Sequence, residues 1–332
     1  MATSYPDRTN ARGIWTLDDI TKNKLTHKTF PRGATRGIMG GGGTPSASDV
    51  IDFINIETAG DASDFGNLAS AAYKSTACAS VTRGVFMAGY IAPAYIDVLE
   101  YITILSTGNT ADFGDSTQAR GTGNEGNLGN NTRGINAGGI GGSPAARVNT
   151  IDYITIASLG DAADFGDLSA IRSAMATSCN TTRGVMAGGA SSGPTNQINT
   201  IEFIEIVSTG NSIDFGDLGT ARDRAGGAAS TTRGLAAGGT SPGATYTSIE
   251  TFQLASLGNG IDFGDLSVAR WTTACMNNIT RGVWGAGDPT SNVIDFVDIA
   301  SAGTATDFGD ATVARFNCRG TSNGHAGLAQ TS

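Results

Sequence analysis

The stretch from Thr182 to Arg222 reads TRGVMAGGASSGPTNQINTIEFIEIVSTGNSIDFGDLGTAR, and the rest of the chain repeats its main features. Two triplets mark the repeat, Thr-Arg-Gly and Asp-Phe-Gly, and the first recurs every 47 to 50 residues. The arginines of the first triplet are Arg36, Arg83, Arg133, Arg183, Arg233 and Arg281. The phenylalanines of the second are Phe65, Phe113, Phe165, Phe215, Phe263 and Phe308. Such a period predicts an array of about six similar units.

Each unit contains four segments with the pattern of short β-strands. The first precedes Thr-Arg-Gly, the second is the apolar run after it, the third is a segment such as IDYITI (151–156), and the fourth runs through Asp-Phe-Gly. In the third segment, period-two alternation places Ile151 and Tyr153 on one face and Ile154 and Ile156 on the other. We therefore expect sheets that are buried on both faces.

Four-stranded antiparallel sheets become buried on both faces when they stack side by side around an axis. The sequence thus predicts an all-β fold, a β-propeller of about six four-stranded blades over residues 31–332. Residues 316–332 supply a first strand and, at Gly327-Leu328, the start of a second. We expect the C-terminal strand to pair with the N-terminal blade and close the ring, leaving no exposed edge. A seven-bladed ring, with residues 11–30 adding strands, is the alternative.

The repeat resembles the kelch repeat of β-propellers. The kelch pattern has a strand ending in Gly-Gly, a strand containing Tyr-Asp, a Trp, a small or apolar residue and an Arg. The corresponding residues here are Gly188-Gly189, Glu202-Phe203, Phe215, Leu218 and Arg222. Phe215 replaces the Trp, so the resemblance implies a kelch-like propeller. The combination of Thr-Arg-Gly with Asp-Phe-Gly-Asp-Leu is also similar to repeats in virion proteins of marine, particularly cyanobacterial, phages.

Residues 1–30 do not repeat, and we predict that they form an attachment segment. The run Gly13-Ile14-Trp15-Thr16-Leu17, followed by Phe30-Pro31, resembles a Gly-x-Trp-Ser-Leu motif with a later Trp-Pro in bacteriophage virion proteins. Thr16 and Phe30 replace the Ser and the Trp of that motif. The residues expected to make the attachment are Trp15, Leu17, Ile20 and Phe30.

Charge and composition exclude several classes of partner. The net charge is −9 and the isoelectric point is near 4.7, without a Lys- or Arg-rich run. An acidic surface repels polyphosphate, so nucleic acid is not an expected partner. No apolar run approaches the length that a bilayer requires, so membrane insertion is not expected. The cysteines Cys78, Cys179, Cys275 and Cys318 fall at shifting offsets in the repeats, and we predict buried thiols.

The repeated charged residues favour structural roles. Asp residues flank Phe-Gly in the second marker, but a pair so spaced lacks the ligand count of a calcium loop. The Thr-Arg-Gly arginines are predicted to pair with a repeated Asp across blades, with an anion-binding ring as the alternative. The two histidines, His27 and His325, lie near opposite ends of the sequence and suggest no triad or metal cluster. A sialidase-like glycosidase would require converging carboxylates that break the repeat. We therefore expect neither an enzyme nor a cofactor.

The resemblances imply a structural virion protein of a bacteriophage, a tail, fibre or appendage component assembled in the cytoplasm of the host bacterium. Residues 1–30 would bind other virion proteins. The loops between the second and third strands vary in length and are expected to emerge together on one face. Recognition of a glycan or protein on the host surface is the alternative function. The loops read GGGTPSASD, YIAPAYIDV, IGGSPAARVN, ASSGPTNQIN, TSPGATYTS and DPTSN.

Overall fold

The computed structural model describes residues 35–121, 126–192 and 196–328, and these residues are folded almost entirely as short β-strands and turns. The chain divides into two units, Met1–Ala34 and Thr35–Ser332, and every described residue belongs to the second. The described residues contain several small antiparallel sheets. The prediction of an all-β chain with four-stranded sheets is therefore confirmed.

Five of the repeats form four-stranded sheets within the described part of the chain. The first sheet contains β28 (Arg319–Ser322), β1 (Arg36–Gly40), β2 (Val50–Asn55) and β3 (Ser63–Asn67). The second contains β4 (Thr76–Ala79), β5 (Arg83–Ile91), β6 (Ala94–Thr103) and β7 (Ala111–Asp115). The fourth contains β14 (Ala176–Cys179), β15 (Arg183–Ala187), β16 (Thr200–Glu205) and β17 (Ile213–Asp217). The fifth contains β18 (Gly226–Ala229), β19 (Arg233–Ala237), β22 (Ser248–Gln253) and β23 (Ile261–Asp265). The sixth contains β24 (Ala274–Asn277), β25 (Arg281–Gly285), β26 (Ser291–Asp298) and β27 (Thr306–Arg315).

The third repeat departs from the predicted four strands. Its sheet has three, β9 (Arg133–Ala137), β12 (Thr150–Thr155) and β13 (Ala163–Asp167). A single bridge between Gly129 and Gly134 stands in place of the first strand. Gly126 and Gly129 have positive φ angles of 130° and 149°, which interrupt a regular strand. Short strands near the loops complete the set: β8 (Arg120–Gly121), β10 (Ile140–Gly141), β11 (Ala146–Arg147), β20 (Thr240–Ser241) and β21 (Ala244–Thr245).

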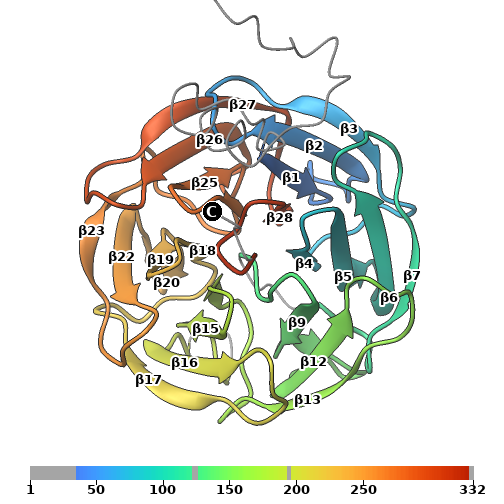
Figure 1. Cartoon of the computed structure of the whole chain (residues 1–332), viewed down its shortest axis with the longest axis horizontal. Helices are drawn as coiled ribbons and strands as arrows, with labels where there is room; N and C mark the ends of the chain where they lie inside the picture. The colour runs from blue at the N-terminus through green and yellow to red at the C-terminus, as the bar shows by residue number, and fades with distance from the viewer. Residues whose placement is uncertain (1–34, 122–125, 193–195, 329–332) are drawn as a thin grey trace, which may run out of the picture. The chain divides into compact units, whose positions relative to one another are not determined.

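The sheets follow one another in chain order around a common centre (Figure 1). First strands such as β4, β18 and β28 lie nearest the centre, and fourth strands such as β7, β17 and β23 lie at the periphery (Figure 1). Strand β28 pairs antiparallel with β1, with Gly37 opposite Ser322 and Gly40 opposite Arg319. The predicted pairing of a C-terminal strand with the N-terminal sheet is confirmed.

The continuation of the chain after β28 differs from the prediction. Gly327 and Leu328 lie in a turn and do not begin a second strand. His325 is buried at 1% exposure, and its Nε2 lies 2.9 Å from the carbonyl oxygen of Ala79. The backbone N–H of Gly327 donates to Nδ1 of the same imidazole at 3.2 Å. This turn is therefore held against the first strand of the second sheet by a buried side chain that the other repeats lack.

The core lies between consecutive sheets. The six marker phenylalanines are each only 2% exposed, as predicted for residues between blades. Phe215 belongs to a cluster that joins Val185 and Ile201 of the fourth sheet to Phe252 and Leu254 of the fifth repeat. Ile151, Ile154 and Ile156 are also at most 1% exposed, so both faces of that strand are buried. Each sheet is thus stabilised mainly by its neighbours.

The glycine of the second marker has a packing role that the sequence did not reveal. Gly258 donates its N–H to the carbonyl oxygen of Phe215 at 2.9 Å. A Cβ on Gly216 would lie 2.5 Å from the carbonyl oxygen of Gly258, too close for any side chain. Gly216 also has a φ of 150°. Consecutive repeats therefore approach each other through their backbones at this position.

Candidate functional site

The Thr-Arg-Gly arginines lie where strand 2 of each sheet begins, and they join consecutive sheets. Arg183 donates from Nη1 to the carbonyl oxygen of Leu254 in the next repeat at 3.1 Å. Its guanidinium carbon lies 4.5 Å from the ring centroid of Phe203. The same bond to a backbone carbonyl is made by Arg36, Arg83, Arg133, Arg233 and Arg281, to Ile104, Ile156, Ile206, Ile299 and Ile56 respectively.

The prediction that these arginines pair with a repeated Asp across blades is wrong. In the described residues, ion pairs of this set involve Arg183 with Glu205 and Arg281 with Asp298, each within one sheet. A carbonyl at the end of the neighbouring third strand needs a donor, and the planar guanidinium reaches it. In five of the six repeats the guanidinium also stacks on an aromatic ring. In the described residues, these arginines therefore make contacts between consecutive repeats.

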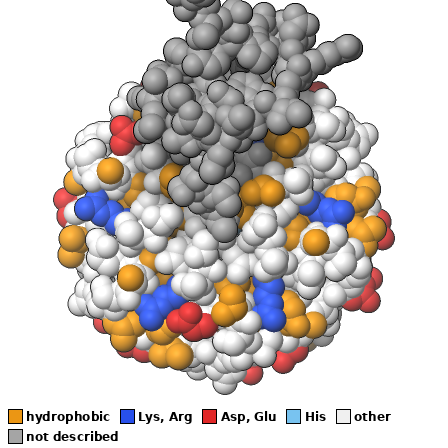
Figure 2. Space-filling model, viewed as in Figure 1, with side chains coloured by type: hydrophobic (Ala, Val, Ile, Leu, Met, Phe, Trp, Pro, Cys, Tyr) orange, Lys and Arg blue, Asp and Glu red, His pale blue; other side chains and the backbone are white. Residues whose placement is uncertain are grey.

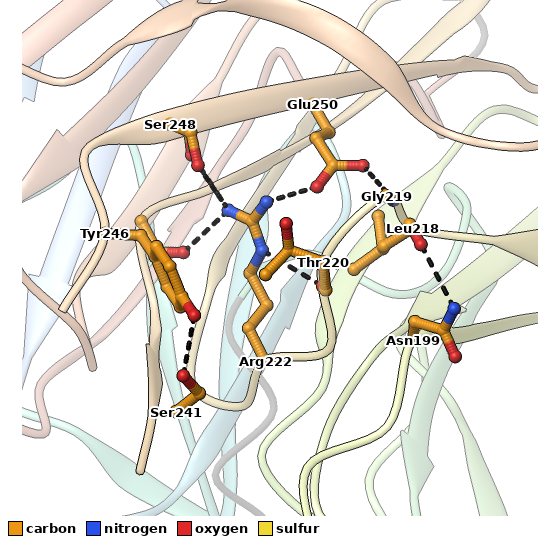
Figure 3. Close-up of polar contacts among 10 residues, drawn as sticks. Asn199, Leu218, Gly219, Thr220, Arg222, Ser241, Tyr246, Ser248 and Glu250 are labelled. Atoms are coloured by element: carbon orange, nitrogen blue, oxygen red, sulfur yellow. Dashed lines mark hydrogen bonds and ion pairs between the residues drawn. The ribbon is translucent and has the colours of Figure 1, made fainter. Parts of the chain in front are cut away.

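A second set of arginines is deeply buried, and the close-up in Figure 3 shows one member. Arg222 lies in the connection that leads into β18, and its Nη2 donates to the carboxylate of Glu250 on β22. Its Nη1 donates to the carbonyl oxygens of Gly238 and Ser248, at 3.1 and 3.0 Å. The other carboxylate oxygen of Glu250 accepts the N–H of Gly219 (Figure 3).

Equivalent ion pairs recur between other sheets, although the sequence analysis singled out only Arg222 of these arginines. The sequence does contain a pattern that identifies the set, since an Arg follows the marker Phe by seven residues in five of the six repeats. A buried charge is tolerated when it is paired and hydrogen-bonded, and each of these arginines meets that condition. The pairs are Arg120 with Asp152, Arg172 with Glu202, Arg270 with Asp295 and Arg315 with Asp52, at 2.7 to 3.0 Å.

Residues that lie just before the first strands line a pocket near the centre of the sheets. Lys74, Ala174, Arg224, Thr272 and Asn317 have positive φ angles of 54° to 62° at equivalent places in their repeats. The N–H of Arg224 donates to the carbonyl oxygen of Ala174 at 2.7 Å, and that of Thr272 donates to Arg224 at 3.1 Å. We call this site the central pocket. Its lining residues are Lys74, Gly121, Ile140, Arg147, Ser173, Ala174, Asp223, Arg224, Thr272, Asn317 and Arg319.

The central pocket is basic although the whole chain is acidic. Its lining includes four cations, Lys74, Arg147, Arg224 and Arg319, and one carboxylate, that of Asp223. Burial lowers the pKa of Lys74, and the neighbouring charges of Arg224 and Arg319 lower it further. Cations held this close repel one another, so an anionic group bound among them would be stabilised by all four.

Aromatic side chains lie beside the central pocket. The rings of Tyr73 and Tyr90 are 5.5 Å apart, and those of Tyr90 and Tyr95 are 5.0 Å apart. Nζ of Lys74 lies 5.5 Å from the centroid of Tyr90, and the guanidinium of Arg224 stacks over Trp271 at 4.7 Å. A cleft of about 720 Å³ is lined by Tyr73, Lys74, Tyr90, Pro93, Ala94, Tyr95, Ala119, Gly142, Ser143 and Ala145.

The loops between second and third strands lie at the same end of the sheets as the central pocket. Residues just before a first strand form bridges to residues just after a second strand, as in Ser173 with Ala190 and Asp223 with Thr240. Three of the predicted loops contain a hairpin, since β10 pairs with β11 and β20 with β21. The longest hairpin joins β5, which continues to Ile91, to β6, which starts at Ala94. Tyr90 pairs with Tyr95 across this longest hairpin. Aromatic and β-branched residues such as Tyr90, Ile91 and Tyr95 favour a strand over a loop.

Metal-binding groups, membrane-spanning helices or reactive cysteines in the described parts of the chain would each bear on function. Within residues 35–121, 126–192 and 196–328, no group of three His, Cys, Asp or Glu side chains is placed to hold a metal ion. No helix in those residues is long and apolar enough to span a membrane. All four cysteines are buried thiols, as predicted, and burial raises the pKa of Cys179 to about 12. The proposed attachment residues Trp15, Leu17, Ile20 and Phe30 lie outside the described residues.

The charged side chains are dispersed on one face of the described residues. Figure 2 shows one face, on which Lys and Arg side chains lie at separate positions and Asp and Glu lie mostly near the rim. On the described part of that face, the basic side chains form no continuous surface of the kind that follows a nucleic-acid backbone.

Comparison with known proteins adds no assignment. No family model matches the chain, and no curated protein matches it either.

Proposed function

We propose that residues 31–332 form a six-bladed, kelch-like β-propeller in which β28 completes the first blade. The repeated markers, the pairing of β28 with β1, and the arginine-to-carbonyl bonds from each repeat to the next all support this architecture. The bond from Arg281 to Ile56 joins the sixth sheet to the first at 3.1 Å. A seven-bladed ring would require strands from residues 11–30, which lie outside the described residues.

We further propose that the chain is a structural protein of a bacteriophage particle, a tail, fibre or appendage component without enzymatic activity. The support is the resemblance of its repeats, and of Gly13-Ile14-Trp15-Thr16-Leu17, to phage virion proteins. In this role the chain is assembled in the bacterial cytoplasm, and residues 1–30 bind a neighbouring virion protein. Trp is enriched among the residues that anchor protein interfaces, so Trp15 is the proposed anchor.

We propose that the propeller binds its partner at the central pocket. Four cations at the centre of an acidic protein, beside tyrosines and variable loops, suit a partner that presents an acidic group. The propeller therefore acts as a docking platform, with its loop end against an acidic segment of another virion protein. Aromatic residues and arginines are enriched in protein interfaces.

The test replaces two of the cations, Lys74 and Arg224, by Ala in the full chain and measures incorporation into particles and adsorption to host cells. We expect particles to lose this subunit, because the acidic partner loses half of its cationic contacts. The matched control, Val207→Glu with Leu257→Glu, changes the net charge equally at side chains that are 62% and 59% exposed. Normal incorporation of the Lys74, Arg224 variant would refute docking through the central pocket.

The attachment segment needs its own test. A chain without residues 1–30 should fold and yet be absent from purified particles, because the segment that binds the neighbouring virion protein is missing. Occupancy equal to that of the full chain would show that the attachment lies elsewhere. Point variants of Trp15 and Leu17 distinguish a specific contact from a mere effect of length.

The alternative is recognition of the host surface, and the cleft beside Tyr73, Tyr90 and Tyr95 favours it. Its volume of about 720 Å³ lies in the range of small-ligand sites, and tyrosine rings pack well on sugar or peptide faces. Tyr90→Ala with Tyr95→Ala would then reduce adsorption while incorporation stays normal. A glycosidase-type propeller remains a weaker alternative, which an assay for release of reducing sugar tests directly.

A further inference from the structure

The second repeat lacks one half of an ion pair that the other repeats contain. The position seven residues after the marker Phe holds Arg in five repeats and Ala72 in the one that follows Phe65. The acid on the neighbouring third strand is nevertheless kept, as Glu100 on β6. Glu100 thus corresponds to Glu250, whose partner is Arg222 (Figure 3).

Glu100 keeps the other hydrogen bonds that the paired acids of the remaining repeats make. Its carboxylate accepts the hydroxyl of Thr110 at 3.0 Å and the N–H of Ala69 at 3.3 Å. Glu250 accepts the N–H of Gly219 in the same way. In the part of the chain that the structure describes, no Lys or Arg forms an ion pair with Glu100. Its carboxylate is therefore oriented for a cation that this chain's own position 72 does not supply.

A cavity of about 70 Å³ lies where the arginine side chain would be. It is larger than the ~10–15 Å³ that one water molecule requires. We call it the Glu100 pocket. Its lining residues are Leu68, Ser70, Ala72, Ser75, Phe86, Ala88, Ile91, Ile96, Val98 and Glu100.

The backbone around the Glu100 pocket also matches the arginine sites. Arg222 donates to the carbonyl oxygens of Gly238 and Ser248, five residues after the Thr-Arg-Gly arginine and two before the acid. Ala88 and Val98 occupy these places in the second repeat, and both line the pocket. The φ angle of Ala88 is also positive, 55°, and is close to the 65° of Gly238. The backbone geometry that receives a guanidinium is therefore retained.

The apolar wall gives the pocket selectivity for an alkyl chain. Ile96 stands at the position of Tyr246, whose ring lies under the guanidinium of Arg222 at 5.2 Å. Ile91 and Ile96 come from the extended β5–β6 hairpin. Burial raises the pKa of Glu100, while Thr110 and Ala69 oppose that shift by hydrogen bonds. A bound cation would offset the same desolvation.

We propose that the Glu100 pocket binds an alkylguanidinium cation, the group that an arginine side chain supplies at the five equivalent positions. The planar head donates to the Glu100 carboxylate and to the carbonyl oxygens of Ala88 and Val98, and the alkyl chain packs on Ile91 and Ile96. The ligand is either a free small guanidinium compound or the arginine side chain of a polypeptide.

The test titrates the full chain with n-propylguanidinium and follows the methyl signals of Ile91 and Ile96 by NMR. We expect saturable shifts of these two signals, and n-propylurea, which is neutral and of similar shape, should cause none. Glu100→Gln should weaken binding by at least about tenfold, since the charged hydrogen bond is lost. Ala72→Arg should abolish binding because its own side chain fills the pocket.

A positive control comes from the matched site. Arg222→Ala empties the corresponding space beside Glu250 and should create a second site for n-propylguanidinium. A Gly-Arg-Gly peptide distinguishes the two sources: competition with n-propylguanidinium identifies a polypeptide side chain, and its failure identifies a free small cation. Absence of saturable shifts, equal binding of n-propylurea, or binding that persists in Ala72→Arg would overturn the proposal.

Discussion

Arg222 and Glu250 form a buried ion pair between consecutive repeats, with side chains that are 1% and 8% exposed. Arg222 enters from the connection after the fourth sheet, and Glu250 lies on a strand of the fifth. The pair thus spans the boundary at which one repeat packs on the next. Because both groups are dehydrated, each depends on the other for compensation of its charge.

Removal of one partner of this pair should be costly. Arg222→Ala should lower the free energy of unfolding by about 3–5 kcal/mol, because the carboxylate of Glu250 is left buried without its cation. The double variant Arg222→Met, Glu250→Leu should recover most of that loss, since no charge remains buried. Urea denaturation of the single and double variants measures the coupling. Additive losses in the double variant would contradict a direct interaction.

The opposite change in the second repeat should stabilise the protein. Ala72→Arg should raise the free energy of unfolding by about 0.5–2 kcal/mol, because it fills a cavity and pairs with Glu100. Thermal unfolding of the variant measures the gain. In a Glu100→Gln background the same substitution should give a smaller gain. A lower melting temperature for Ala72→Arg would mean that the cavity does not fit an arginine.

The marker phenylalanines should contribute through packing between sheets. Phe215→Ala should lower the free energy of unfolding by about 3–5 kcal/mol, because a ring that contacts both the fourth and fifth sheets is lost. Val207→Ala is the control, since Val207 is 62% exposed and its truncation should cost at most about 0.5 kcal/mol. Equal denaturation midpoints for Phe215→Ala and the wild type would place the ring outside the core.

Periodicity alone predicted the elements that depend on local pattern. The alternation around Ile151 gave a strand buried on both faces, and the spacing of the markers placed Phe215 between sheets. The unmatched first strand near the C-terminus was enough to predict that β28 pairs with β1. These features follow from the alternation of side chains along a strand and from the need of an edge strand for a partner, and both can be recognised in short stretches of sequence.

Partners across sheets could not be predicted in the same way. An arginine can donate to either a carboxylate or a carbonyl, and the approach of the next sheet determines that Arg183 reaches the carbonyl oxygen of Leu254. The central pocket combines residues from several repeats, so no single repeat contains its pattern. Ala72 was visible as a break in the repeat, but its meaning depends on Glu100, which lies in a later segment. The third repeat lost its first strand because of the backbone conformation of Gly126 and Gly129.

The buried imidazole of His325 should make stability depend on pH. Burial lowers its pKa from 6.5 to about 4. Between these two pH values the imidazole is protonated in the unfolded chain but neutral in the folded chain. The contribution of His325 to the free energy of unfolding is therefore fully present above about pH 6.5 and is lost as the pH decreases toward 4. The loss from this group is on the order of 3 kcal/mol.

Denaturation of the wild type and of His325→Gln across this range isolates the imidazole. Gln has no titrating group, and its amide retains a donor for the carbonyl oxygen of Ala79. Burial raises the pKa of Glu100 and of Asp223, which gives the opposite slope, but both proteins share that contribution. The difference in stability between wild type and variant should therefore shrink as the pH falls from 6.5 to 4. A difference that stays constant over this interval would show that His325 is protonated equally in the folded and unfolded states, and that it lies in contact with water.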